Sequence, residues 1–145
     1  MKFAWNQPGG LTECPYFHFS GISFKRFSIR SHLWHSDDDT RAYHDHPHWF
    51  ITIVLRGGYT DVSPNGRDVL RFLSVRFRRA DYKHSVQEVI PETRTLLLCG
   101  PSKRRWGFWI GDKLIKRDKY FVTHGHHPCH GLQEPVRIRP DGSRR

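Results

Sequence analysis

The sequence predicts an all-β protein. Aromatic residues make up 14% of its 145 residues, including ten Phe and five Trp, and such residues favour pleated sheets. No stretch longer than about a dozen residues keeps a helical period. Short apolar stretches recur roughly every ten residues, separated by Gly and Pro residues that favour turns. This spacing is typical of a β-sandwich or a β-barrel.

The N-terminal part of the chain predicts an irregular lead-in followed by short strands. Residues 1–15 are rich in Gly and Pro and predict no regular element. Over residues 26–33, apolar side chains alternate with Arg and His. This alternation predicts a half-buried strand with Phe27, Ile29 and Leu33 on its apolar side.

The middle of the chain contains the strongest strand, residues 48–55, whose apolar character is nearly continuous. Such a stretch is typical of a strand covered on both faces. Gly57-Gly58 then permits a tight turn, and residues 69–77 predict one long strand. Further strands are expected at residues 84–90, 95–99 and 106–110.

A histidine motif precedes the strongest strand. In His44-Asp45-His46-Pro47, the two histidines are two positions apart, so on an extended segment they point to the same face. Imidazoles on one face can share a metal ion, and they suit iron, zinc, copper and nickel. His84, just before a later strand, would complete a site of three histidines. Because the chain has 11 His, the alternative is a set of hydrogen-bonded core histidines.

These residues resemble the motifs of the cupin superfamily. The first cupin motif combines His-x-His with a glycine after the next strand, as in His44-Asp45-His46 and Gly57. The second has a histidine at the start of a returning strand, as at His84. The resemblance implies one double-stranded β-helix, or jelly-roll, barrel. The position of the usual acidic ligand holds Phe50 or Ile51, so the implied ligand set is three histidines.

The chain is also similar to a group of small, uncharacterised cupin-like proteins from bacteria and phages. They share the His-Asp-His-Pro motif, Gly57-Gly58-Tyr59, residues 95–101 and Arg105-Trp106-Gly107-Phe108. This similarity covers roughly residues 28–130. It names a fold without naming an activity.

The resemblance implies one divalent transition metal held by His44, His46 and His84. Fe²⁺ is favoured, with Zn²⁺, Mn²⁺ and Ni²⁺ as alternatives. The implied activity is that of a three-histidine, non-haem iron oxygenase acting on a small molecule, as in the thiol dioxygenases. No catalytic acid or base is identified. Cupins often pair through sheet edges, so the resemblance implies a homodimer.

Strand parity predicts residues of a substrate pocket. Phe50 and Thr52 share the parity of His44 and His46 and would line an inward, mostly apolar pocket. Arg71 is a further candidate because an inward arginine can bind a carboxylate with two hydrogen bonds. An arginine at the strand edge that reaches solvent is the alternative.

The positive charge of the chain indicates a second class of function, the binding of nucleic acid. The formal net charge is +10, which favours acidic partners such as nucleic acid. Lys103, Arg104 and Arg105 lie beside Trp106 and could combine phosphate contact with stacking. An ordinary exposed hairpin with a buried Trp is the favoured explanation of these residues. The alternative to an enzyme is therefore a non-catalytic cupin module associated with nucleic acid or with a phage.

The ends of the chain and its cysteines complete the predictions. Residues 1–132 are expected to form the barrel, and residues 133–145 a basic, flexible tail. The cluster within residues 124–130 is a weak candidate for a second metal site. Three cysteines do not suggest a disulfide framework, and no apolar segment suggests a signal peptide or a membrane span. A cytoplasmic protein is therefore expected.

Overall fold

The computed structural model describes residues 1–125 and 136–144. Within these residues the chain forms strands and a single short helix, which confirms the all-β prediction. In chain order the elements are β1 (Lys2–Gly10), β2 (Pro15–Ser23), β3 (Ser28–Trp34), β4 (Tyr43–His44), β5 (Phe50–Arg56), β6 (Tyr59–Ser63), β7 (Gly66–Leu70), β8 (Val75–Arg78), β9 (Ser85–Gln87), β10 (Thr93–Cys99), β11 (Gly107–Ile110), β12 (Lys113–Lys116) and α1 (Arg117–His124).

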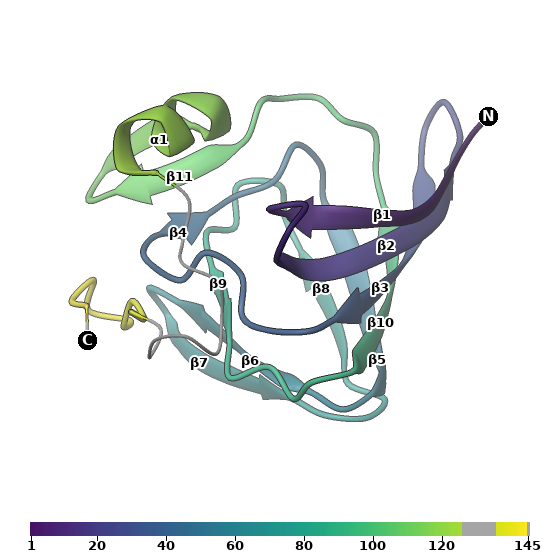
Figure 1. The fold of residues 1–145 in the computed structure, drawn as a ribbon, viewed down its shortest axis with the longest axis horizontal. Coiled ribbons are helices and arrows are strands. Elements are labelled where there is room, and N and C mark those ends of the chain that lie inside the picture. Colours follow the sequence, from purple (N-terminus) through teal and green to yellow (C-terminus); the bar gives the residue numbers. More distant parts are fainter. Residues whose placement is uncertain (126–135, 145) are drawn as a thin grey trace.

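The strands form one large sheet and two small ones. The large sheet has the order β1-β2-β3-β10-β5-β8, and the small sheets have the orders β12-β11-β4 and β7-β6-β9. In Figure 1 the large sheet curves around one side of the molecule, while β4, β9 and β6 lie across from it. The paired strands are antiparallel, and together they enclose the interior of a barrel.

The strand β5 shows how the sequence builds the inner wall. Phe50, Thr52 and Val54 are buried, while the intervening Ile51 and Ile53 are only half-buried. This is the alternation of a strand with one face toward the interior. The interior cluster beside it contains Trp34, Val54, Tyr59, Leu70 and Val86.

Two predicted elements differ from the structure. Residues 1–15 contain β1, which pairs along the edge of the large sheet with β2. Residues 69–77 are not one strand, because a turn at Arg71–Ser74 divides them. The Ser74 N–H donates to the carbonyl of Arg71, and Leu73 takes the left-handed conformation with φ 66°. As a result, β7 and β8 belong to different sheets.

The face of β3 that lies inside is the opposite of the predicted one. His32 and Trp34 are buried, whereas Ile29 is 39% exposed. Phe27, just before the strand, is 40% exposed. The apolar side of this strand therefore forms part of the outer surface of the large sheet, and its polar side faces the interior.

The helix and a disulfide bond were not predicted from the sequence. The helix α1 covers one end of the barrel, where Tyr120 stacks on Phe108 with ring centroids 4.1 Å apart. Cys14 takes part in a disulfide bond, whereas Cys99 is a free, buried thiol. Among the residues that the structure describes, no helix has the length and apolar character needed to cross a membrane.

Residues 136–144 are the described part of the segment predicted as a tail, and they contact the barrel. The N–H of Ile138 donates to the carbonyl of Thr40 at 2.9 Å, and Gln87 Nε2 donates to the Ile138 carbonyl at 2.9 Å. Arg137 pairs with the buried carboxylate of Asp37 at 3.0 Å. These contacts hold this part of the segment against the loop that precedes β4.

Candidate metal centre

The backbone itself brings the three predicted histidines together. His44 ends β4, and His84 immediately precedes β9. The two residues form an isolated antiparallel bridge, in which the His44 N–H donates to the His84 carbonyl at 2.9 Å and the His84 N–H donates back at 3.0 Å. His46 lies two residues beyond His44, so its ring reaches the same side.

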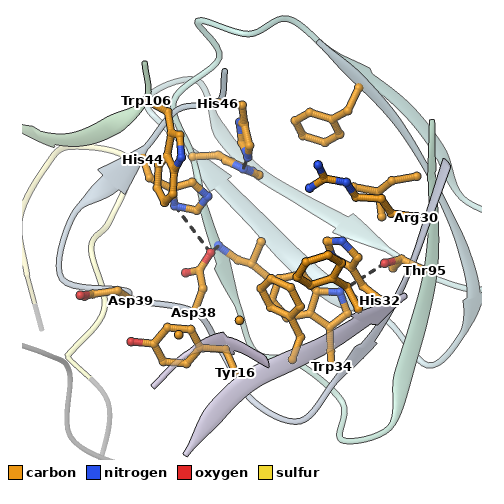
Figure 2. Close-up of a pocket in the computed structure, with 18 of the residues that line it drawn as sticks. Tyr16, Arg30, His32, Trp34, Asp38, Asp39, His44, His46, Thr95 and Trp106 are labelled. Carbon is orange, nitrogen blue, oxygen red and sulfur yellow. Dashed lines mark hydrogen bonds and ion pairs between the residues drawn. The ribbon is translucent and has the colours of Figure 1, made fainter. Parts of the chain in front are cut away.

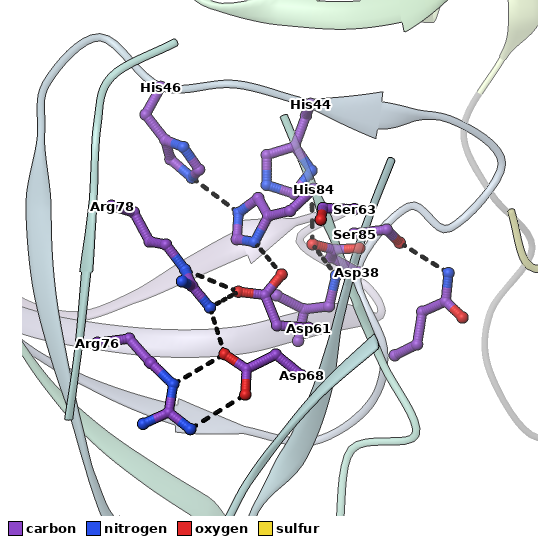
Figure 3. Close-up of polar contacts among 12 residues, drawn as sticks. Asp38, His44, His46, Asp61, Ser63, Asp68, Arg76, Arg78, His84 and Ser85 are labelled. Atoms are coloured by element: carbon purple, nitrogen blue, oxygen red, sulfur yellow. Dashed lines mark hydrogen bonds and ion pairs between the residues drawn. The ribbon is translucent and has the colours of Figure 1, made fainter. Parts of the chain in front are cut away.

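The three rings converge on one point. His44, His46 and His84 each offer a ring nitrogen, and these nitrogens all lie within 4.8 Å of one another. His84 Nε2 and His46 Nε2 lie 3.3 Å apart. Figure 3 shows the three rings turned toward each other. His84 is buried, whereas His44 and His46 are partly exposed to the cavity.

Asp61 on β6 fixes the orientation of His84. Its Oδ1 lies 2.7 Å from His84 Nδ1, so this ring nitrogen carries the proton and Nε2 faces the other two histidines. Arg78 donates to the same carboxylate at 3.0 Å and to Asp68 at 2.7 Å, and Arg76 also binds Asp68 (Figure 3). A carboxylate behind a metal-binding histidine holds the ring and raises its basicity.

A second carboxylate lies beside His44. Asp38 Oδ2 is 3.6 Å from His44 Nδ1 and accepts the N–H of Val86 at 3.3 Å. Asp38 Oδ1 has no hydrogen-bond partner among the described residues. Burial, followed by the charges of neighbouring aspartates, raises the pKa of Asp38 well above its usual value. Asp38 thus faces the cavity next to the histidine cluster.

The environment keeps two of the histidines neutral. Burial, and then the charge of His84, lower the pKa of His44 and of His46 well below the usual value. A neutral imidazole has a free lone pair, which is the form that binds a metal. Three converging imidazoles, one of them oriented by Asp61, therefore fit a divalent transition metal.

Asp45, between the two motif histidines, has a structural position. Its carboxylate accepts the N–H of Gly107 at 3.0 Å and the indole N–H of Trp109 at 3.3 Å. Arg104 donates to it at 2.9 Å and also to the His46 carbonyl. Of the three predicted nucleic-acid contacts, Arg104 is therefore directed inward, whereas Lys103 and Arg105 are exposed.

The histidine cluster opens into a cavity of about 490 Å³. Phe50 and Thr52 line this cavity together with the three histidines, but Arg71 does not. Arg71 is exposed, because β7 ends at Leu70 and the following turn carries the arginine away. The structure thus contradicts its placement in the pocket.

Several cavity residues were not predicted from the sequence. Figure 2 shows Arg30, His32 and Trp34 on the opposite side of the cavity from His44 and Trp106, with Asp38 beside His44. His48 also lines the cavity, is buried, and lies outside the group of converging ligand atoms. An aspartate within a buried strand, as at Asp61, is the pattern that could have indicated a partner for a histidine.

Most of the predicted C-terminal cluster lies outside the described residues. His124, at the end of α1, is described, and its ring stacks on Tyr120 at 4.7 Å. The second metal site predicted within residues 124–130 remains a prediction.

Comparison with solved structures identifies the fold. The polyketide cyclase RemF from Streptomyces resistomycificus matches with a TM-score of 0.57 at 14% identity, over 86% of this chain and 93% of that chain. An uncharacterised conserved protein with a double-stranded β-helix domain from Klebsiella pneumoniae matches with a TM-score of 0.51 at 17% identity, over 66% and 85%. Salicylate 1,2-dioxygenase from Pseudoaminobacter salicylatoxidans, in complex with gentisate, matches with a TM-score of 0.50 at 11% identity, over 59% and 25%.

These similarities show the fold, which is the cupin-type double-stranded β-helix that the sequence predicts. No family model matches the chain, and no curated protein matches it. The geometry of the cavity and its histidines must therefore carry any functional argument.

Proposed function

We propose that this protein is a metal-binding cupin in which His44, His46 and His84 hold one divalent transition metal. The cavity beside them would bind a small organic substrate, and the activity would be that of a three-histidine oxygenase. The observation that carries the proposal is the convergence of three ring nitrogens within 4.8 Å at one end of a cavity. The similarity in fold to a dioxygenase solved with gentisate supports it.

Fe²⁺ is the favoured metal, and Zn²⁺, Mn²⁺ and Ni²⁺ are the alternatives. A bound ion with only three protein ligands would keep open positions and supply Lewis-acid or redox chemistry. The residues around it have separate tasks. Asp61 would orient His84, and the aromatic walls, including Phe50 and Trp106, would limit the access of water to the substrate.

Elemental analysis of untagged protein tests the metal site. We expect about one metal ion per chain in the wild type and a large loss in His84→Ala. His35→Ala is the matched control, since His35 belongs to a separate pair with His18, at 2.8 Å. Equal metal content in wild type and His84→Ala would contradict the proposed ligand set.

Oxygen uptake tests the proposed activity. Protein loaded with Fe²⁺ without oxygen would be mixed with panels of thiols, keto acids and aromatic acids in aerated buffer. We expect one class to stimulate oxygen uptake in the wild type and not in His84→Ala. Inertness toward all classes, with iron bound at one ion per chain, would argue against the oxygenase.

The alternative is a non-catalytic module that binds nucleic acid or belongs to a phage assembly. The exposed side chains of Lys103 and Arg105, in a chain with a net charge of +10, favour the nucleic-acid form of it. Binding would weaken steeply with salt and would fall in the double variant Lys103→Gln/Arg105→Gln. Arg104 is left unchanged because it holds Asp45. Retention of binding in the double variant would exclude this surface.

We also propose a homodimer that pairs through the outer surface of the large sheet. Ile29, Leu98, Ile51 and Phe77 are neighbours in register across β3, β10, β5 and β8. Three of them are more than a third exposed. A continuous apolar row on a sheet surface is suited to burial against a second copy. A cytoplasmic location remains a prediction.

A further inference from the structure

The wall of the cavity across from the histidines carries two polar side chains of β3. Arg30 and His32 are two positions apart and point inward, with Trp34 following on the same face. In the sheet, Arg30 lies beside Leu97 of β10, and His32 lies beside Thr95. Figure 2 shows the guanidinium of Arg30 directed into the cavity.

Arg30 carries a positive charge without a carboxylate partner in the described part of the chain. Its guanidinium lies 5.6 Å from the ring of Phe19, and no described side chain forms an ion pair with it. The other arginine that lines the cavity, Arg117, pairs with Asp118 at 3.3 Å. Charged groups that face an enclosed cavity are usually paired, so Arg30 is suited to an anion supplied by a ligand.

His32 adds unpaired hydrogen-bonding groups beside this charge. Its ring stacks on Phe17, with centroids 4.6 Å apart and planes at 7°. Both ring nitrogens are buried and have no hydrogen-bond partner among the described residues. Burial, followed by the charge of Arg30, lowers the pKa of His32 to about 3. The ring is therefore neutral, and it has one N–H donor and one acceptor that no described residue uses.

His48 extends the same polar region toward the metal ligands. It lines the cavity, and its Nδ1 also lacks a partner within the described residues. Buried polar atoms are almost always hydrogen-bonded, so several unpaired atoms in one region of a cavity indicate a place for a polar ligand group.

The remaining surface of this region is apolar. Phe17, Phe19 and Leu97 line the cavity around Arg30 and His32. A small apolar pocket with a few convergent polar groups is suited to an organic molecule with one polar end. One guanidinium and one neutral imidazole provide the donors that a single carboxylate accepts.

We propose that Arg30 and His32 form a binding site for the carboxylate of a small organic acid. The apolar body of the acid lies between Phe19 and Leu97, and its far end extends toward His44, His46 and His84. This inference rests on the proposed function and names its substrate class. The binding of the carboxylate itself does not require a metal.

The test measures the binding of simple acids to the metal-free protein by titration calorimetry. The probes are benzoate and butanoate, each with its neutral amide as the matched compound, and inorganic phosphate as a second anion. We expect both acids to bind more tightly than their amides. In Arg30→Gln, acid binding should weaken about tenfold to a hundredfold, as for a lost charge-assisted hydrogen bond, while amide binding should not change.

Arg94→Gln is the control because it removes the same charge from the same sheet. Arg94 lies on β10, the strand that pairs with β3 beside Arg30, but its guanidinium donates to Ser31 Oγ at 3.2 Å on the outer face. Acid binding should be unchanged in this variant. His32→Phe keeps the stacked ring without the nitrogens, and it should weaken acid binding by a smaller factor, about threefold to tenfold.

Three results would overturn the inference: no binding of either acid to folded wild type, equal acid affinity in wild type and Arg30→Gln, or equal losses in Arg30→Gln and Arg94→Gln. Tighter binding of phosphate than of both acids would overturn the carboxylate assignment.

If Arg30→Gln does not fold, as judged by circular dichroism, His32→Phe and Arg30→Lys provide the same comparison. If the wild type binds the acids but holds no metal, the proposed metal centre is wrong and this site stands. If it holds metal but binds no acid, this site is wrong and the metal centre stands.

Discussion

A single carboxylate, that of Asp61, determines which nitrogen of His84 faces the cavity. The Oδ1–Nδ1 distance of 2.7 Å leaves Nε2 free to meet His46. Asp61 is in turn held by Arg78 at 3.0 Å. The geometry of the candidate ligands therefore depends on Asp61, a side chain that does not line the cavity.

Replacing Asp61 should weaken metal binding without removing a ligand. Asp61→Asn keeps the size of the side chain but loses the charge that fixes the Nδ1–H tautomer of His84. We expect the affinity for Zn²⁺ or Fe²⁺ to fall about 10-fold to 100-fold, measured by competition with a chelating dye.

Asp68→Asn is the control for the lost ion pair. Asp68 binds Arg76 and Arg78 but does not contact His84. Its replacement should lower stability slightly and leave the metal affinity within about twofold. Equal losses of affinity in both variants would show that charge near the site, rather than the orientation of His84, is responsible.

The buried ring of His32 makes the metal-free protein sensitive to acid. Its pKa falls from 6.5 to about 3 on folding, so between these values the unfolded chain binds a proton that the folded chain does not. The free energy of unfolding therefore decreases as the pH falls through this window, by up to about 1.4 kcal/mol per pH unit for this group.

Urea denaturation of the metal-free protein from pH 7 to pH 5 measures this effect. We expect His32→Phe to lose less stability than the wild type over the same range, because the proton-binding group is absent. His124→Phe, on the exposed end of α1, controls for the loss of a surface histidine. Parallel pH profiles for wild type and His32→Phe would contradict the prediction.

At the scale of the elements, the turn between β5 and β6 is tightly constrained. Gly57 has φ +73°, and a Cβ at this position would collide with the side chain of Thr93. Thr93 Oγ1 also accepts the N–H of Gly58 at 2.9 Å. The start of β10 thus packs directly against the turn.

We expect Gly57→Ala to cost about 2–4 kcal/mol of unfolding free energy, from the left-handed backbone together with the collision. Gly111→Ala is the matched control, since Gly111 has φ +59° with no atom within 4 Å of its would-be Cβ. Gly111→Ala should cost only about 1 kcal/mol of unfolding free energy, because the left-handed backbone is unfavourable there but no atom is in the way. Thermal or chemical denaturation of both variants measures the difference, and similar costs would show that the contact with Thr93 does not matter.

The same elements show what the sequence could and could not predict. Local period and turn chemistry predict β5 and the turn at Gly57, and parity alone places His44 and His46 on one side. The inner face of β3 was assigned wrongly, because its more apolar side, at Ile29, lies on the outer surface of the large sheet. Arg30 and His32 were missed for that reason.

Long-range pairing explains the remaining differences at the site. Asp61 meets His84 only because β6 pairs with β9, where Asp61 lies opposite Val86. No local pattern indicates that pairing. Arg71 failed as a pocket residue because the turn after β7 ends the alternation on which the prediction depended.

For the molecule as a whole, the outer apolar row predicts a dimer. Val75 on β8 extends this surface beside Ile53 and is 54% exposed. Val75→Glu would place a carboxylate in the contact, where an unpaired charge is costly to bury. We expect at least about tenfold weaker self-association, measured by sedimentation equilibrium.

Val122→Glu makes the same change on α1, where the side chain is 84% exposed. It should leave self-association unchanged. A wild-type protein that remains monomeric at high concentration would contradict the dimer, and equal effects of both substitutions would place the contact elsewhere.

The pairing of β3 with β10 also governs the order in which the molecule can assemble. Ser28 lies opposite Cys99 and Trp34 opposite Thr93, so both histidine motifs lie within the loop that this pairing closes. Closing so long a loop is slow compared with forming a local hairpin. We therefore expect the barrel to form more slowly than a local hairpin such as β6–β7. A metal ion that binds only the finished barrel would be expected to slow its unfolding.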